Sequence, residues 1–176
     1  TGKPVVLLLF TGRPLILNWE SEHIPSILNV WFGGSETGDA VADVLFGKAV
    51  PCGKLTTTFP RSVGQLPLFY NHLNTGRPDP DNRVFNRYAS NYLDESNEPL
   101  YPFGYGLSYT DFVYGDLQLS SETLPKNGNL TASVTVTNKG NHDGYETVQI
   151  YLRDIYAEVA RPERLRSYLP EKRRKP

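Results

Sequence analysis

Proline interrupts the middle of this chain so often that no long helix or strand can form there. Proline lacks a backbone N–H and fixes φ, which breaks regular elements. Between them the sequence supplies aromatic side chains that could anchor an irregular segment: Phe69, Tyr70, Phe85, Tyr88 and Tyr92. We therefore predict that residues 69–111 form an irregular aromatic and proline-rich connection packed on a domain surface, because loops of this length are uncommon unless they carry function or are disordered. The prolines concerned are Pro60, Pro67, Pro78, Pro80, Pro99 and Pro102.

The residues before this connection have an α/β pattern. Pro4 to Phe10 is an unbroken apolar run closed by Thr11-Gly12-Arg13-Pro14, which is typical of a strand buried on both faces of a parallel sheet. A second apolar run, Ser26 to Phe32, ends at Gly33-Gly34. One layer of an α/β domain needs several such units, so residues 1–68 are predicted to be the end of a larger α/β sandwich domain.

A helix is predicted directly after the second apolar run. Ser35 is an N-cap residue type and Glu36 would lie in the first turn, where a negative charge is favourable. Apolar residues then recur with helical spacing at Ala40, Val41, Val44 and Leu45, and Gly47 occupies the place of a left-handed residue after the helix.

The last part of the chain has the period of β-strands. Leu130, Ala132, Val134 and Val136 alternate with polar residues, and Val148, Ile150 and Leu152 alternate again after a turn at residues 138–144. We predict an antiparallel β-sandwich over residues 112–176. A fibronectin-like sandwich takes about 100 residues and seven strands, so we expect this one to be cut short after three or four strands.

Composition excludes several classes of function. The formal net charge of −1 gives no general field for nucleic acid or an anionic membrane, and no apolar run of about 18 residues would span a membrane. Cys52 is the single cysteine, and His23, His72 and His142 lie far apart, so no metal site and no cofactor are predicted. Residues 161–176 hold seven basic and two acidic residues, which we interpret as a solvated tail. The chain contains no methionine and begins at Thr1, so we expect it to be a fragment.

The turn Gly33-Gly34-Ser35-Glu36-Thr37-Gly38 is the sharpest candidate for a ligand site in the sequence. A helix N-terminus after a glycine-rich turn can present free N–H groups to an anion. However, no Walker lysine follows, and Glu36 would repel a phosphate. A tight turn, with Glu36 favourable to the helix dipole or bonded to a nearby loop, is the plainer interpretation.

No catalytic residue emerges from the remaining candidates. Glu20 and Glu22 are close in sequence, as paired glycosidase carboxylates would be in space, but residues two apart do not face each other on a helix or on a strand. Asp39 and Asp43 share a helix face and are interpreted as a polar outer surface. Asn71-His72 beside Tyr70 is either a hydrogen-bonding lip or a plain loop.

Four motifs occur in a fixed order along the chain. They are Lys3 to Val6 with Gly12 to Leu15, Trp31 to Gly38 with Ala42 to Gly47, Gly53 to Leu55 with Phe59 to Gln65, and Tyr101 to Tyr109. Together they resemble the C-terminal half of family 3 glycoside hydrolases, most closely the bacterial periplasmic β-glucosidases. Val134 to Gly140 and Gly144 to Tyr151 are similar to the fibronectin-III-like domain of that family, whereas the residues after Pro162 depart from its pattern and put the last strands in doubt.

The resemblance implies a retaining, exo-acting β-glycosidase of the β-glucosidase type that removes terminal β-linked glucosyl or related residues. It implies an N-terminal (β/α)8 barrel that carries the nucleophile, and an acid/base glutamate upstream of the Lys3 to Val6 strand. No residue of this chain inherits a catalytic role, so the chain alone is expected to be inactive. A β-glucoside or oligosaccharide would be bound only by the complete enzyme, and the expected location is periplasmic or secreted.

Two other interpretations stay open. The chain could be a non-catalytic carbohydrate-binding or structural module in which Tyr70, Phe103, Tyr105 and Tyr109 form a platform for sugar. It could also be a non-functional piece whose exposed sheet edges lead to aggregation.

Overall fold

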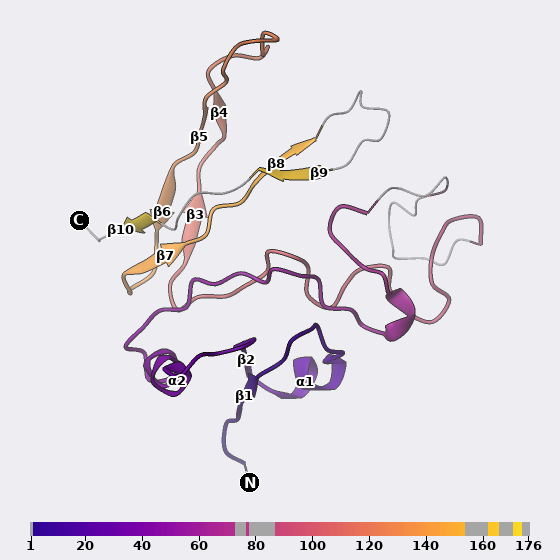
Figure 1. Cartoon of the computed structure of the whole chain (residues 1–176), viewed down its shortest axis with the longest axis vertical. Coiled ribbons are helices and arrows are strands. Elements are labelled where there is room, and N and C mark those ends of the chain that lie inside the picture. Colours follow the sequence, from indigo (N-terminus) through magenta and orange to yellow (C-terminus); the bar gives the residue numbers. More distant parts are fainter. Residues whose placement is uncertain (1, 73–76, 78–86, 154–161, 166–170, 174–176) are drawn as a thin grey trace.

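The computed structural model describes residues 2–72, 77, 87–153, 162–165 and 171–173, with the first part of the chain below and the β-rich part above in Figure 1. The first part holds two strands and two helices: β1 (Val6–Leu9), α1 (Asn18–His23), β2 (Ser26–Asn29) and α2 (Thr37–Leu45). Strands β1 and β2 pair in parallel, with Val6 opposite Ser26 and Leu9 opposite Asn29. The predicted parallel α/β pattern is therefore confirmed.

Burial of these strands differs from the prediction. Leu9 is 9% exposed, but Val6 is 43% exposed, and Phe32, just after β2, is 85% exposed. In the described part of the chain this sheet has two strands, and the core of Leu9, Leu17 and Phe59 packs on it. The prediction of burial on both faces was wrong for this chain, because a second covering layer is needed to bury the other face.

The N-cap of helix α2 lies one residue later than the predicted Ser35. It is Glu36, which makes no side-chain capping bond, and the first turn instead holds a hydrogen bond of 2.6 Å from the Thr37 hydroxyl to the Gly34 carbonyl. Gly47 has φ of 75°, so the predicted left-handed residue after the helix is confirmed.

Two aromatic segments, residues 52–60 before the predicted connection and residues 100–106 near its end, run antiparallel to each other, and we call them the ribbon. The Leu55 amide donates to the Tyr105 carbonyl over 2.7 Å, and the Phe59 amide donates to the Tyr101 carbonyl over 2.9 Å. Their traces lie side by side across the middle of Figure 1. The sequence analysis did not predict this pairing. A short 3-10 helix, η1 (Val63–Gln65), follows the first segment.

The β-rich part is built from antiparallel pairs: β3 with β6, β4 with β5, β7 with β10, and β8 with β9. Antiparallel pairing was predicted and is confirmed. The expected alternation is present at Val134 and Val136, which are half-buried while Thr135 and Thr137 are exposed, but not at Leu130 and Ala132, which are exposed like their neighbours. The strand bounds are β3 Phe112–Tyr114, β4 Gln118–Leu119, β5 Ala132–Ser133, β6 Val136–Asn138, β7 Gly144–Glu146, β8 Ile150–Arg153, β9 Pro162–Leu165 and β10 Glu171–Arg173.

Three predictions for this part were wrong. Eight short strands, β3 to β10, follow residue 111 within the described residues, where three or four were expected. Ile150 and Leu152 do not alternate in burial with Tyr151, since all three are exposed by 44% to 57%. The basic end is not wholly a solvated tail, because Glu171–Arg173 pairs with β7 and Pro162–Leu165 pairs with β8. Charge alone did not predict this, because strands pair through backbone N–H and C=O groups, which charged residues also carry. The other residues of the predicted tail lie outside the described residues.

Candidate functional site

Phe59 is the centre of the aromatic packing that joins the ribbon to the first part of the chain. It is 1% exposed. Its ring centroid lies 5.9 Å from that of Trp31 and 6.4 Å from that of Tyr101, which it meets edge-on. Such tilted and edge-on pairs contribute beyond the apolar area that they bury. The first ribbon segment is thereby fixed both to its partner segment and to the loop after β2.

Gln65 fixes the turn after the ribbon. It is 2% exposed. Its amide oxygen accepts from the Arg61 backbone N–H at 2.6 Å, and its amide nitrogen donates to the Ser96 carbonyl at 2.8 Å. A buried polar side chain is retained at low cost only when its groups are paired in this way. Gln65 therefore joins η1 to residues 96–98.

The four aromatic residues proposed as a sugar platform make three separate contacts. Tyr70 stacks on Phe103 with 4.5 Å between ring centroids, and Tyr105 stacks on Tyr101 at 5.1 Å. Tyr109 instead donates its hydroxyl hydrogen to the Val44 carbonyl of α2 at 3.0 Å. The structure therefore divides the set among three different contacts, in which the rings pack on protein.

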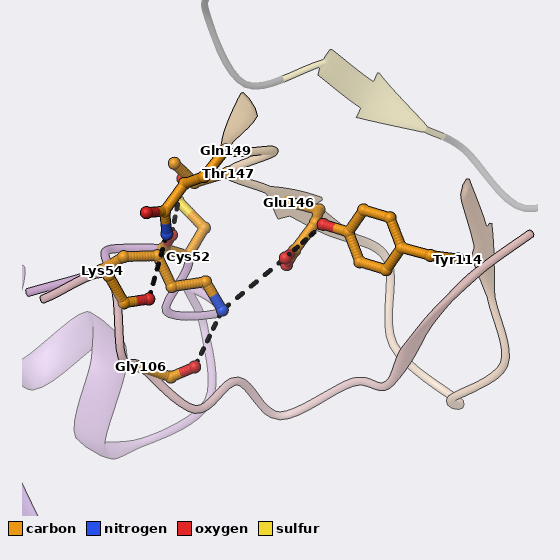
Figure 2. Close-up of polar contacts among 8 residues, drawn as sticks. Cys52, Lys54, Gly106, Tyr114, Glu146, Thr147 and Gln149 are labelled. Atoms are coloured by element: carbon orange, nitrogen blue, oxygen red, sulfur yellow. Dashed lines mark hydrogen bonds and ion pairs between the residues drawn. The ribbon is translucent and has the colours of Figure 1, made fainter. Parts of the chain in front are cut away.

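A polar cluster joins the ribbon to the β-rich part (Figure 2). The Lys54 ammonium donates to the Gly106 carbonyl at 2.8 Å and lies 3.7 Å from a carboxylate oxygen of Glu146. The two charged side chains are only 16% and 13% exposed. The Tyr114 hydroxyl donates to the same carboxylate at 2.8 Å. Glu146 is thus held between a cation from the ribbon and a phenol from β3.

The environment of Tyr114 favours its neutral form. Burial of the phenol, then its hydrogen bond to Glu146 and the negative charge of that carboxylate, raise the pKa of Tyr114 above its usual value. At neutral pH the phenol is therefore a firm hydrogen-bond donor to Glu146. A tyrosine held in this way is suited to structure rather than to proton transfer near neutral pH.

Residues after Glu146 continue the contact with the ribbon. The Thr147 hydroxyl donates to the Cys52 carbonyl at 2.9 Å (Figure 2). The side-chain amide nitrogen of Gln149 donates to the Gly104 carbonyl at 3.0 Å. Neither the Lys54 to Glu146 pair nor these bonds had a local signal in the sequence, since their partners are far apart along the chain. Lys54 and Glu146 do lie in segments that carry the family resemblance.

The hollows among the described residues include two on the first part of the chain. One of ≈ 520 Å³ lies between β2 and the start of α2 and includes the Gly33 to Thr37 turn. The second, of ≈ 560 Å³, lies between β2 and the ribbon and is lined by largely apolar side chains such as Leu17, Ile27 and Phe59. Asn29 and Ser108 also line the second hollow and have buried side-chain polar atoms without a hydrogen-bond partner among the described residues.

Residues 1–109 match the model of the glycosyl hydrolase family 3 C-terminal domain. The chain belongs to glycosyl hydrolase family 3. It is 55% identical over 162 residues to a periplasmic β-glucosidase of Salmonella typhimurium, and 49% identical over 161 residues to a β-xylosidase of Formosa agariphila. Among solved structures, a β-glucosidase of Listeria innocua in complex with glucose matches with a TM-score of 0.83 and 45% identity.

The family 3 chain spans about a fifth of the length of these relatives. Each of the two sequence matches covers 92% of this chain but 21% of the relative. The Listeria structure matches 97% of this chain over 23% of its own. The resemblance drawn from the four sequence motifs is confirmed by these matches.

The candidate carboxylates of this family 3 chain have ordinary structural settings. Glu20 and Glu22 lie on α1, two residues apart, where side chains do not face each other. On the same helix Trp19 stacks on the His23 ring with 4.7 Å between centroids, a pairing that the sequence analysis missed although its spacing of four residues allows it. Asp43 forms an ion pair with Lys48 at 2.9 Å on the exposed side of α2, as expected for a polar outer face.

The remaining candidates bring no new chemistry together. The Gly33 to Gly38 turn is closed by the Thr37 bond to Gly34, as in the tight-turn interpretation. The His72 amide donates to the Phe69 carbonyl at 3.3 Å in a local turn. Within the residues that the structure describes, no group of three metal-ligating side chains gathers, and no helix has the length and apolar character needed to cross a bilayer.

Proposed function

We propose that this chain forms the C-terminal region of a retaining, exo-acting β-glycosidase of the β-glucosidase type. Such an enzyme would hydrolyse terminal β-linked glucosyl or related residues. The observation that carries the proposal is the 55% identity to the Salmonella typhimurium periplasmic β-glucosidase over 92% of this chain. The structural match to the Listeria innocua β-glucosidase supports it.

The catalytic carboxyl groups are proposed to belong to residues outside this chain. Retaining glycosidases use two carboxyl groups about 5 Å apart, one as nucleophile and one as acid/base. The relatives have about four-fifths of their length outside the match, since it covers 21% of them. We therefore assign no catalytic residue here, and we expect activity only when an N-terminal barrel domain is present.

Three regions are proposed for the chain. Residues 1–68 would complete an α/β sandwich domain, residues 69–111 would be an irregular connection, and residues 112–176 would form a fibronectin-III-like domain. The exposed apolar side chains around β1 and β2 support the first assignment, because further strands of an α/β domain would cover them. The antiparallel pairs after Phe112 support the third.

The substrate is proposed to be a β-glucoside, with a β-xyloside as the nearest alternative. Relatives named β-glucosidase and β-xylosidase match almost equally long stretches, at 55% and 49% identity. The two sugars differ by one hydroxymethyl group, which a pocket recognises through residues around that group. A periplasmic or secreted location is proposed from the periplasmic Salmonella relative.

The test compares the chain with a longer protein that contains it. The longer protein should release the phenol from an aryl β-glucoside faster than from the matching β-xyloside, with retention of configuration at the anomeric carbon. The 176-residue chain alone should release neither phenol. Turnover by the chain alone, at a rate near that of the longer protein, would contradict the proposal.

A further inference from the structure

Residues 146–151 lie across the ribbon and touch it at successive points. Glu146 pairs with Lys54, Thr147 bonds to the Cys52 carbonyl, and Gln149 bonds to the Gly104 carbonyl. Tyr151 then reaches beyond the ribbon to Tyr70, with 6.0 Å between ring centroids. We call Glu146, Thr147, Gln149 and Tyr151 the docking seam.

Gly104 leaves room for the Gln149 side chain because it has no side chain of its own. Its φ of 81° lies in the left-handed region, which other residues rarely adopt. A Cβ atom at this position would also collide with the side-chain amide of Gln149. The missing side chain therefore lets Gln149 approach the ribbon backbone and donate to the carbonyl of Gly104.

Gln149 and Tyr151 act as a pair. The Tyr151 hydroxyl donates to the Gln149 amide oxygen at 2.6 Å, while the Gln149 amide nitrogen donates to Gly104. The tyrosine thus orients the amide whose other end binds the ribbon. Chains of hydrogen bonds of this kind strengthen one another when they are partly buried.

Tyr151 also contacts the segment formed by residues 66–72, which we call the Tyr70 segment. Its described backbone hydrogen bonds are local, from Leu66 to Val63 and from His72 to Phe69. The Tyr70 ring gives this segment two long-range contacts, since it stacks on Phe103 of the ribbon and meets the edge of Tyr151. Tyr70 is therefore held between the ribbon and the β-rich part.

We propose that the docking seam is a positioning device through which the β-rich part holds the Tyr70 segment in place. The Lys54 pair and the Thr147 bond fix the seam to the ribbon, and Gln149 and Tyr151 carry that constraint to Tyr70. The proposal does not depend on the glycosidase assignment. It gives the β-rich part a role within the chain itself, which is to fix the conformation of a segment that precedes it by many residues.

Hydrogen exchange on the full 176-residue chain tests the proposal, with Tyr151→Leu compared with Tyr109→Leu. The two tyrosines are a matched pair because each is 46% exposed and each donates one hydrogen bond, but only Tyr151 contacts Tyr70. Tyr151→Leu should speed amide exchange in residues 66–72 by about two- to tenfold, the range expected for loss of one aromatic contact. Tyr109→Leu should leave the exchange of these amides unchanged.

Gln149→Ala provides a second and milder test. It should speed exchange in residues 66–72 less than Tyr151→Leu does, because Tyr151 keeps its ring contact. If Tyr151→Leu does not fold, Gln149→Ala and Tyr151→Phe decide in its place. The proposal is supported if a substitution raises the exchange rate in residues 66–72 more than in the rest of the chain. It is overturned if the rate there is unchanged, or if the rate rises equally over the whole chain.

Discussion

The ammonium group of Lys54 lies 3.7 Å from the carboxylate of Glu146, and both side chains are largely buried. Lys54 belongs to the ribbon and Glu146 to β7 in the β-rich part. Two charges are removed from water at this contact, which is costly unless further hydrogen bonds satisfy them. The Gly106 carbonyl and the Tyr114 hydroxyl supply those bonds.

Removing either charge should therefore destabilise the chain more than removing both. Lys54→Met leaves Glu146 buried without its cation and should lower the free energy of unfolding by about 3 kcal/mol. In a double-mutant cycle with Glu146→Gln, the double variant should lose less stability than Lys54→Met alone, and less than the sum of the single losses by about 1 kcal/mol or more. Urea denaturation measures all four proteins, and strict additivity would show that the pair is not coupled.

Tyr114 should make the chain less stable at alkaline pH. Its raised pKa means that the unfolded chain, in which tyrosine ionises near pH 10, releases this proton first as pH rises. The contribution is complete below about pH 10 and is lost as pH rises towards the pKa of the folded state. Between about pH 9 and 11 the wild-type chain should lose more stability than Tyr114→Phe. Equal slopes for the two proteins in denaturation series would contradict this prediction.

Gln65 should be among the most sensitive polar residues of the chain. Its side chain bonds to a backbone group before the irregular connection, at Arg61, and to one within it, at Ser96, and is 2% exposed. Gln65→Ala should cost about 2–4 kcal/mol, since it leaves buried groups unpaired and opens a cavity. Gln118→Ala, on the exposed face of β4, is the matched control and should change stability by less than about 0.5 kcal/mol. Thermal and urea unfolding of both variants compare the two sites.

Gly106 should not tolerate a side chain. A Cβ atom there would lie 2.5 Å from the Gly53 carbonyl oxygen on the facing ribbon segment, so backbone atoms would have to move. Gly106→Ala should cost about 1–3 kcal/mol, as overpacking does elsewhere. Gly34→Ala meets no atom within 4 Å and serves as the control. A Gly106→Ala variant as stable as Gly34→Ala would show that the ribbon segments can separate without cost.

The sequence was most informative where structure depends on neighbouring residues. The parallel strands, helix α2, the left-handed Gly47 and the alternation around Val134 and Val136 all follow from local patterns of apolar and turn residues. The predicted burial of β1 on both faces was wrong, because burial depends on which other elements cover the strand. The start of α2 was misplaced by one residue, and the Thr37 side chain, not that of Ser35, bonds to Gly34 there.

Long-range contacts could not be read from one sequence. The ribbon, the Lys54 to Glu146 pair and the Tyr151 to Tyr70 contact join residues with no shared periodicity. Family resemblance located the segments but did not pair them. The contacts of the proposed aromatic platform could not be predicted for the same reason: Tyr70 and Phe103 stack on each other, whereas Tyr105 and Tyr109 contact other residues.

The most direct test of the account is a chimera with the Salmonella typhimurium relative. The stretch of that β-glucosidase matched by this chain, an alignment of 162 residues, is replaced by the chain, and hydrolysis of an aryl β-glucoside is measured for the chimera and for the chain alone. The account predicts that the chimera hydrolyses the glucoside and that the chain alone does not. A folded chimera without activity, or a chain that hydrolyses the glucoside by itself, would contradict it.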